Sequence, residues 1–112
     1  MKTKILLLTT LLVGLFIFNA SAQTPVVKTK TENIYGSSFT AQITYLPGQL
    51  YTTPTIARNG GSPVYMSSYS HSPGTINVDK FYAVVDGWEV YVTITGNFSI
   101  GWQIYSIEAI VP

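Results

Sequence analysis

The 112-residue chain contains no cysteine, a single histidine and few charged residues, which make up 10% of the total. Without cysteine it can form neither a disulfide nor a thiolate-ligated metal site. One histidine is too few for an imidazole metal centre, and no aspartate-rich calcium loop occurs. The six cations form no stripe that would hold a phosphate backbone. We therefore expect no metal, no cofactor and no nucleic-acid partner.

The N-terminal residues have the charge and hydropathy pattern of a cleavable secretory leader. Lys2 and Lys4 precede an apolar run, Ile5–Phe18, and small residues follow in Asn19-Ala20-Ser21-Ala22. The run is shorter than the ~18–20 residues that a helix needs to cross a bilayer. We therefore predict a signal peptide, Met1–Ala22, rather than a membrane anchor. This leader resembles those of exported bacterial proteins, in particular of the Bacteroidota. The expected destination is extracellular or periplasmic, with no membrane span after cleavage.

Removal of the predicted leader changes the composition of what remains. Residues 23–112 carry four cations and five carboxylates, so the net charge falls from +1 to about −1. A stretch of this length forms a single domain, and so small a domain buries only ~60–65% of the surface of its unfolded chain. Because no disulfide compensates, we expect a core dense in aromatic residues. The few charges also favour a homo-oligomer.

Strand and turn residues dominate the predicted domain, and no stretch has the pattern of an amphipathic helix. Phe39–Leu46 alternates between apolar and polar residues, whereas Pro54 makes its neighbourhood an edge or bulged strand. In chain order we expect a strand or free arm at Gln23–Lys30, a turn at Asn33–Ser38, strands at Phe39–Leu46 and Leu50–Arg58, a turn at Asn59–Ser62, a strand at Val64–Tyr69, a loop at Ser70–Gly74 and a short strand at Ile76–Val78.

Turn chemistry and apolar pattern together predict a meander in the last third of the chain. Asp86-Gly87 is a type I′ turn signal that pairs Val85 with Trp88 and, on the other face, Tyr82 with Tyr91. The predicted strands are Phe81–Val85, Trp88–Ile94 and Phe98–Ile104, with Phe81, Trp88, Phe98 and Trp102 in the core.

For the second turn of the meander, the apolar pattern alone gives a prediction. A three-residue loop, Thr95–Asn97, brings Phe98 and Ile100 onto the apolar face, whereas a two-residue loop turns them outward. The alternation changes phase after Ile104, which predicts a bulge near Tyr105-Ser106 or a last strand buried on both faces.

The apolar face of this meander must be buried against another secondary-structure element. The strands from Phe39 to Tyr69 supply a second sheet. The predicted fold of residues 23–112 is therefore all-β, a small two-sheet antiparallel β-sandwich of the immunoglobulin-like or jelly-roll-like kind.

Catalytic chemistry finds little support in the sequence. His71 is the one candidate base for a Ser–His–Asp hydrolase, with Asp79 or Asp86 to orient it. No G-x-S-x-G motif supplies a nucleophile, and the carboxylates form no evident glycosidase pair. We interpret His71 as a solvated loop residue and predict no catalytic residue and no enzymatic activity.

Tyrosines are the candidate contact residues. Tyr82 and Tyr91 face each other on the outer surface, with Gly101 expected beside Tyr91, and such a pair can stack on a sugar ring or a partner's backbone. The alternative is an ordinary cross-strand pair that stabilises the hairpin. Tyr65 and Tyr69 share a parity and extend the surface.

Two functions follow from these contacts. We expect a secreted protein that acts by surface contact, as a self-assembling or adhesive extracellular subunit, with a second copy or a cell-surface component as its partner. The alternative is a carbohydrate-binding module that holds a polysaccharide on its tyrosine pair.

Overall fold

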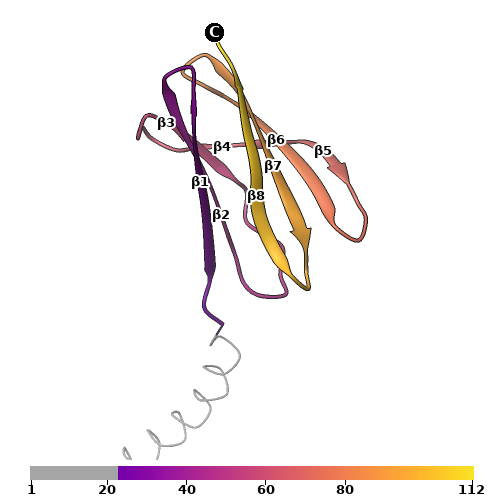
Figure 1. Cartoon of the computed structure of the whole chain (residues 1–112). Coiled ribbons are helices and arrows are strands. Elements are labelled where there is room, and N and C mark those ends of the chain that lie inside the picture. Colours follow the sequence, from indigo (N-terminus) through magenta and orange to yellow (C-terminus); the bar gives the residue numbers. More distant parts are fainter. Residues whose placement is uncertain (1–22) are drawn as a thin grey trace, which may run out of the picture.

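The computed structural model describes residues 23–112, and the predicted leader, Met1–Ala22, lies outside this part of the chain. The described part consists of β-strands, turns and loops (Figure 1). It contains no helix long and apolar enough to cross a membrane. In chain order the strands are β1 (Val26–Ile34), β2 (Ser37–Tyr45), β3 (Thr55–Arg58), β4 (Val64–Tyr65), β5 (Ser67–Ser72), β6 (Asn77–Val85), β7 (Trp88–Asn97) and β8 (Gly101–Ile110).

Two antiparallel four-stranded sheets, β1-β2-β3-β4 and β5-β6-β7-β8, pack around one apolar core. The predicted all-β sandwich is confirmed. The chain passes between the sheets once, at Met66, so each sheet is a meander of consecutive strands. In immunoglobulin and jelly-roll sandwiches the chain changes sheets repeatedly through Greek-key connections. The described strands have the sandwich architecture with a simpler, sequential connectivity.

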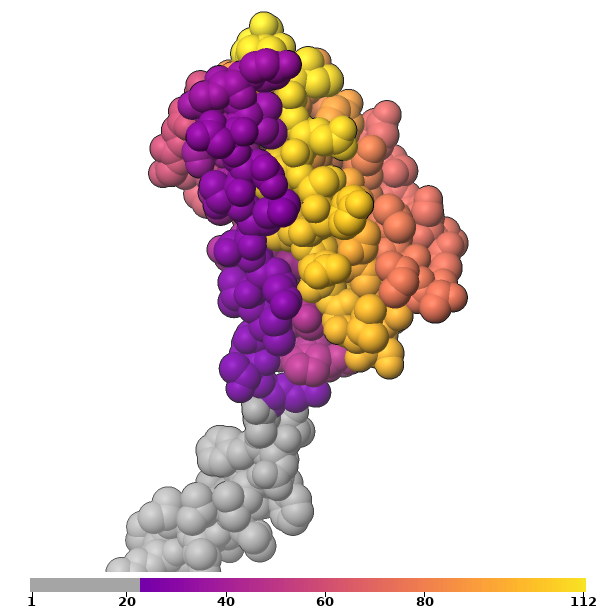
Figure 2. Space-filling view, in the orientation of Figure 1, coloured from indigo at the N-terminus to yellow at the C-terminus, as the bar shows by residue number. Residues whose placement is uncertain are grey.

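The N-terminal segment of the domain is a strand of the first sheet. β1 pairs with β2 along its whole length, from Val26 opposite Tyr45 to Ile34 opposite Ser37. Of the two alternatives for Gln23–Lys30, the strand is therefore observed from Val26 onward. β1 is the edge of its sheet and runs beside β8, the edge of the other sheet (Figure 2).

The strands after β1 follow the predicted pattern in part. The apolar side chains of β2, including Phe39 and Ile43, are buried as the alternation predicts. Leu50–Arg58 is strand only after Pro54, and β3 lies between β2 and β4 rather than at an edge. The predicted strand Val64–Tyr69 divides at Met66 into β4 and β5, which belong to different sheets.

The β6–β7 hairpin has the register predicted from the sequence. Val85 pairs with Trp88 and Tyr82 with Tyr91. The turn residues Asp86 and Gly87 have φ angles of 50° and 84°, in the positive range that a type I′ turn requires. Turn chemistry and the apolar alternation demand the same pairing here, so the prediction is confirmed.

The β7–β8 turn differs from the predicted one. β7 continues to Asn97, which pairs with Gly101, so the turn residues are Phe98–Ile100 and not Thr95–Asn97. The Asn97 side chain fixes this turn, because its Oδ1 accepts hydrogen bonds from the backbone N–H groups of Ser99 (2.9 Å) and Ile100 (2.8 Å). Such local side-chain bonds compete directly with strand pairing.

The shifted turn changes the predicted core. Trp88 and Trp102 are buried, and Phe81 packs against the core while partly buried, as predicted. Phe98 is instead 55% exposed and Ile100 is 70% exposed. The prediction that these two residues face the core is therefore wrong.

A bulge lies where the phase of the alternation changes. Thr93 pairs with Ser106 and Ile94 with Ile104, so Tyr105 is the extra residue of β8. The predicted bulge near Tyr105-Ser106 is confirmed. The bulge returns Ile107 to the buried face, which explains the change of parity after Ile104.

Close backbone approach explains the glycines beside the β7–β8 turn. Gly96 has φ 147°, and a Cβ there would overlap the carbonyl oxygen of Gly101. A Cβ at Gly101 would in turn overlap the hydroxyl of Tyr45. Only glycine fits at either position without displacing a strand or the Tyr45 ring.

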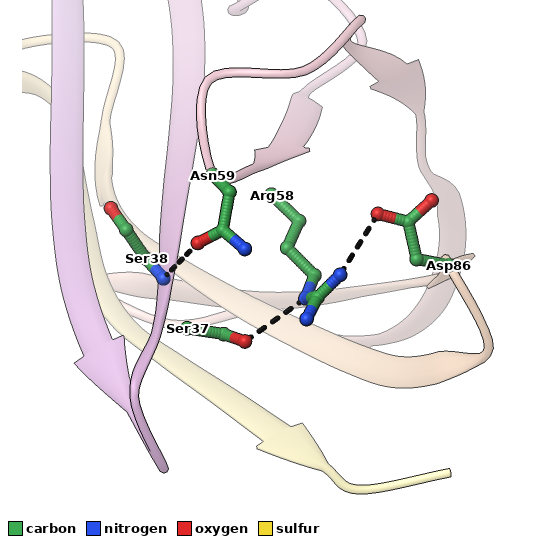
Figure 3. Close-up of polar contacts among 5 residues, drawn as sticks. All are labelled: Ser37, Ser38, Arg58, Asn59 and Asp86. Carbon is green, nitrogen blue, oxygen red and sulfur yellow. Dashed lines mark hydrogen bonds and ion pairs between the residues drawn. The ribbon is translucent and has the colours of Figure 1, made fainter.

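A polar clamp joins the two sheets at the end of the sandwich that carries the β6–β7 turn (Figure 3). The Arg58 side chain donates to Ser37 Oγ at 3.0 Å and to Asp86 Oδ2 at 3.3 Å. Its guanidinium lies 5.3 Å from the ring centroid of Trp88. Asn59 Oδ1 accepts from the backbone N–H of Ser38 at 2.8 Å, which ties the β3–β4 turn to β2.

Candidate functional site

Three tyrosines gather on the outer surface of the second sheet. Tyr82 and Tyr91 lie opposite each other on β6 and β7, with ring centroids 5.1 Å apart. Tyr69 lies at an irregularity of β5, where the pairing shifts between Ser68 and Ser70, and its ring centroid is 5.2 Å from that of Tyr91 in an edge-to-face arrangement. We call these three residues the tyrosine face.

Polar side chains border the tyrosine face. Glu108 of β8 lies opposite Tyr91, and its carboxylate is 4.0 Å from the ammonium group of Lys80 on β6. Ser67, opposite Tyr82, and Ser70, opposite Lys80, supply exposed hydroxyls on the β5 side. The surface thus combines aromatic ring faces with hydrogen-bond donors and hydrogen-bond acceptors.

Tyr91, the central residue of the tyrosine face, has a raised pKa. Partial burial, the neighbouring Tyr69 and Glu89, and to a lesser extent Tyr82, raise the pKa of Tyr91 above its ordinary value. The Tyr91 hydroxyl therefore stays protonated, as a hydrogen-bond donor, across the physiological range.

The structure separates the predicted contact residues into two groups. It places Tyr69, Tyr82 and Tyr91 together, whereas Tyr65 lies on β4 of the other sheet, 75% exposed. Gly101 is not beside Tyr91, because Glu108 takes that position and Gly101 pairs with Asn97. The expected glycine gap is therefore wrong, and Tyr69 completes the cluster instead.

A second candidate site is a cleft between the β2–β3 connection and strands β5 and β6. It has a volume of about 340 Å³ and its lining includes Tyr51, Ser68, His71 and Asp79. The predicted loop Ser70–Gly74 is wrong here, because β5 extends to Ser72 and places His71 opposite Asp79. We call this the histidine cleft.

Asp79 is the buried centre of the histidine cleft. Its Oδ2 accepts a 2.5 Å hydrogen bond from the Tyr51 hydroxyl, and its Oδ1 contacts His71 Nδ1. Burial and the Asp79 carboxylate raise the pKa of Tyr51 far above its ordinary value. A buried carboxylate with both oxygens engaged is well satisfied, which explains how the domain tolerates it.

The His71–Asp79 contact has the orientation of a base and its orienting carboxylate. In a Ser–His–Asp triad the carboxylate binds Nδ1 and leaves Nε2 for the nucleophile. Ser68 lines the same cleft, but among the described residues no hydrogen bond joins it to His71. The described residues also contain no group of three or more metal-ligating side chains. The cleft thus holds two of the three residues of a triad, His71 and Asp79, and its observed contacts are those of a structural polar cluster.

The sequence pairs His71 with Asp79 or Asp86, but it does not predict that Tyr51 binds Asp79 or that Tyr69 joins the tyrosine face. The Tyr51–Asp79–His71 cluster joins a loop to two strands, and the one sequence signal for it is an aspartate at a position of β6 that alternation assigns to the core. Tyr69 reaches the tyrosine face because of the pairing shift in β5, which no local pattern marks.

Comparisons with known proteins add no relative to this description. The chain matches no protein-family model, no curated protein and no solved structure.

Proposed function

We propose that this chain is a secreted, non-enzymatic β-sandwich protein that acts by surface contact, as a self-assembling or adhesive subunit outside the cell or in the periplasm. The observation that carries the proposal is the tyrosine face. Tyr69 is 62% exposed, and its ring packs against the partly exposed Tyr91, which in turn packs against Tyr82 on the sheet surface.

Tyrosine clusters of this kind are suited to molecular contact. A tyrosine ring offers a large rigid surface at low entropic cost, and its hydroxyl bonds a partner at the rim. The Lys80–Glu108 pair beside the rings adds charges of both signs, which favours a specific orientation over unspecific sticking. The low charge of residues 23–112 reduces repulsion between copies.

The test measures assembly and adhesion in the purified exported protein. Size-exclusion chromatography with light scattering reports the oligomer, and binding to the producing cells reports adhesion. Tyr91→Ala and Tyr69→Ala should each weaken contact by about tenfold, as truncation of a central aromatic does. Tyr65→Ala is the matched control, because Tyr65 is an exposed tyrosine on the other sheet. A monomer that binds no cell, or equal losses in all three variants, contradicts the proposal.

A carbohydrate-binding module is the second candidate. It is supported by the ring faces together with the exposed hydroxyls of Ser67 and Ser70, since sugar rings pair an apolar face with hydroxyl groups. Polysaccharide affinity electrophoresis distinguishes the two functions. Retardation of the wild type, lost in Tyr91→Ala and kept in Tyr65→Ala, favours sugar recognition. Absence of retardation on all polysaccharides removes this candidate.

A further inference from the structure

Apolar side chains are exposed on three connections at one end of the sandwich. Leu46 and Leu50 lie in the β2–β3 connection, Ile76 before β6, and Phe98 and Ile100 in the β7–β8 turn. Leu50 is 57% exposed, comparable to the two turn residues. Figure 1 shows the β2–β3 connection, the β7–β8 turn and the start of β1 at the same end. We call these five residues the apolar end.

The apolar end is a built surface. Asn97 Nδ2 donates to the carbonyl of Thr75 at 2.9 Å, which joins the β7–β8 turn to the connection that precedes β6. The indole N–H of Trp102 donates to the carbonyl of Gln49 at 2.9 Å, and its ring packs edge-to-face on Phe98. The three connections are thus tied together in positions that keep their apolar side chains in water.

Turn chemistry does not require these side chains. The Asn97 bonds that form the β7–β8 turn go to backbone N–H groups, so polar residues at positions 98 and 100 would serve equally. Continuous exposed apolar surface is costly in water and marks an interaction site. The opposite end of the sandwich differs in that the Arg58–Asp86 clamp lies there (Figure 3), beside exposed Tyr35, Ile110 and Val111.

Two observations favour a bilayer as the partner. Three grooves surround Tyr45 at this end, and Lys28 is the sole charged residue among those that line them. Aliphatic and Phe side chains with a flanking cation are the composition that inserts into a lipid interface. The five residues of the apolar end include no Trp or Arg, which are enriched at the centres of protein interfaces.

The position of the preceding chain gives the second observation. Gln23 Nε2 donates to the carbonyl of Pro47 at 3.3 Å, so residues 1–22 join the domain at the apolar end. Their sequence includes the apolar run Ile5–Phe18. Until the predicted cleavage after Ala22, such a leader in a membrane would tether the domain through its apolar end and bring this end close to the lipid.

From this geometry we propose that the apolar end docks on the surface of a phospholipid bilayer, with Phe98, Ile100 and Leu50 in the acyl-chain boundary. Lys28 faces the headgroups, which favours anionic lipids. This docking is independent of the tyrosine face, which lies on the outer surface of one sheet, so the failure of one proposal leaves the other intact.

The first test is co-sedimentation of the exported, leader-processed protein with vesicles of phosphatidylethanolamine and phosphatidylglycerol. The N-terminus of the sample is verified by mass spectrometry. Phe98→Ser/Ile100→Ser should lower vesicle affinity by at least about tenfold, because each side chain loses its transfer from water. Leu50→Ser, on a different connection, should lower it independently. Val84→Ser and Tyr35→Ser remove exposed apolar surface elsewhere and should bind as the wild type does.

The second test locates the tips within the lipid. Phe98→Trp should bind vesicles and be quenched by lipids brominated in the acyl chain, whereas Tyr35→Trp should not. Near-ultraviolet circular dichroism and thermal unfolding establish whether each variant is folded. If Phe98→Ser/Ile100→Ser does not fold, the vesicle affinity of Leu50→Ser decides the test. Wild type that stays in the supernatant with every vesicle overturns the proposal. The proposal is also overturned if the variants at Phe98, Ile100 and Leu50 bind vesicles like the wild type. If these variants lose only self-association, the apolar end is instead a contact with a second copy of the chain.

Discussion

The indole N–H of Trp102 bonds to the backbone carbonyl of Gln49 across the two sheets, at 2.9 Å. The same ring packs edge-to-face against Tyr51 and Phe98, with centroids 5.0 and 5.4 Å away. Through this one side chain the β2–β3 connection is held to β8. The histidine cleft and the apolar end, which both include Leu50 of that connection, therefore depend on the same anchor.

Replacement of Trp102 by Phe should lower the free energy of unfolding by roughly 1–3 kcal/mol, because it removes a hydrogen bond and part of a buried ring. Urea denaturation followed by far-ultraviolet circular dichroism measures the change. Tyr105→Phe is the control, since this exposed ring lies on the same strand and should change stability by less than about 0.5 kcal/mol. Equal stability of both variants would show that the anchor contributes little.

Tyr51→Phe tests the bond to Asp79. The substitution keeps the ring and removes the hydroxyl that satisfies a buried carboxylate oxygen. At neutral pH we expect a loss of roughly 1.5–3 kcal/mol, the range for hydrogen bonds to charged groups. The measurement is equilibrium denaturation of wild type and variant in the same buffer. A change below ~0.5 kcal/mol would mean that water replaces the hydroxyl at no cost.

Alkaline pH should destabilise the protein through the same residue. The pKa of Tyr51 is raised in the fold, first by burial and then by Asp79. An unfolded tyrosine ionises near pH ~10, so above that pH the unfolded chain releases a proton that the folded chain keeps. The contribution of Tyr51 is therefore complete below about pH 10 and declines as the pH rises toward its folded value. Between neutral and alkaline pH, the midpoint temperature of thermal unfolding should fall less steeply in Tyr51→Phe than in wild type. Parallel plots of this temperature against pH would contradict this account.

Arg58→Lys should lower the free energy of unfolding by about 1 kcal/mol, because an ammonium group cannot stack on Trp88 and reach Ser37 and Asp86 together. Asp86→Asn separates the contributions. It removes the carboxylate of a partly exposed ion pair and keeps an Asn-Gly turn that is equally suited to the hairpin. We expect this control to change stability by less than about 1 kcal/mol. If Asp86→Asn lowers stability more than Arg58→Lys does, the Arg58–Asp86 ion pair is the main source of the clamp's stabilisation.

Gly96→Ala should destabilise the domain by more than about 2 kcal/mol, since the new methyl group overlaps the carbonyl oxygen of Gly101. Gly48→Ala is the comparison, with positive φ and no atom within 4 Å of the added carbon. That change should cost about 1 kcal/mol, for backbone strain alone. Chemical denaturation of both variants measures the difference, and equal losses would show that the overlap relaxes freely.

Prediction from the sequence succeeds where two local signals agree. Asp86-Gly87 and the alternation on both sides of it demand one register, so the pairing of Tyr82 with Tyr91 follows from the sequence. The change of parity after Ile104 predicts either a bulge near Tyr105-Ser106 or a last strand buried on both faces, and the structure has the bulge at Tyr105. The sandwich follows because each strand set has one apolar face to cover.

Prediction fails where one signal stands alone or a contact is distant. At the β7–β8 turn the apolar pattern favours burial of Phe98 and Ile100, but the hydrogen bonds of Asn97 decide the register and leave both exposed. The pattern of apolar residues alone does not distinguish an apolar side chain in a turn that faces water from one in the core. The Tyr51–Asp79 bond joins positions 28 residues apart, and no spacing rule anticipates it.

The single passage of the chain between sheets, at Met66, has a consequence for the rate of folding. Every strand pairs with its immediate neighbour in the sequence, so each pairing closes a short loop and loses little chain entropy. Greek-key sandwiches must instead join distant segments before their sheets are complete, and folding slows as the sequence separation of contacts grows. This domain has the contact order of two stacked meanders, and it should fold faster than Greek-key β-sandwiches of equal length.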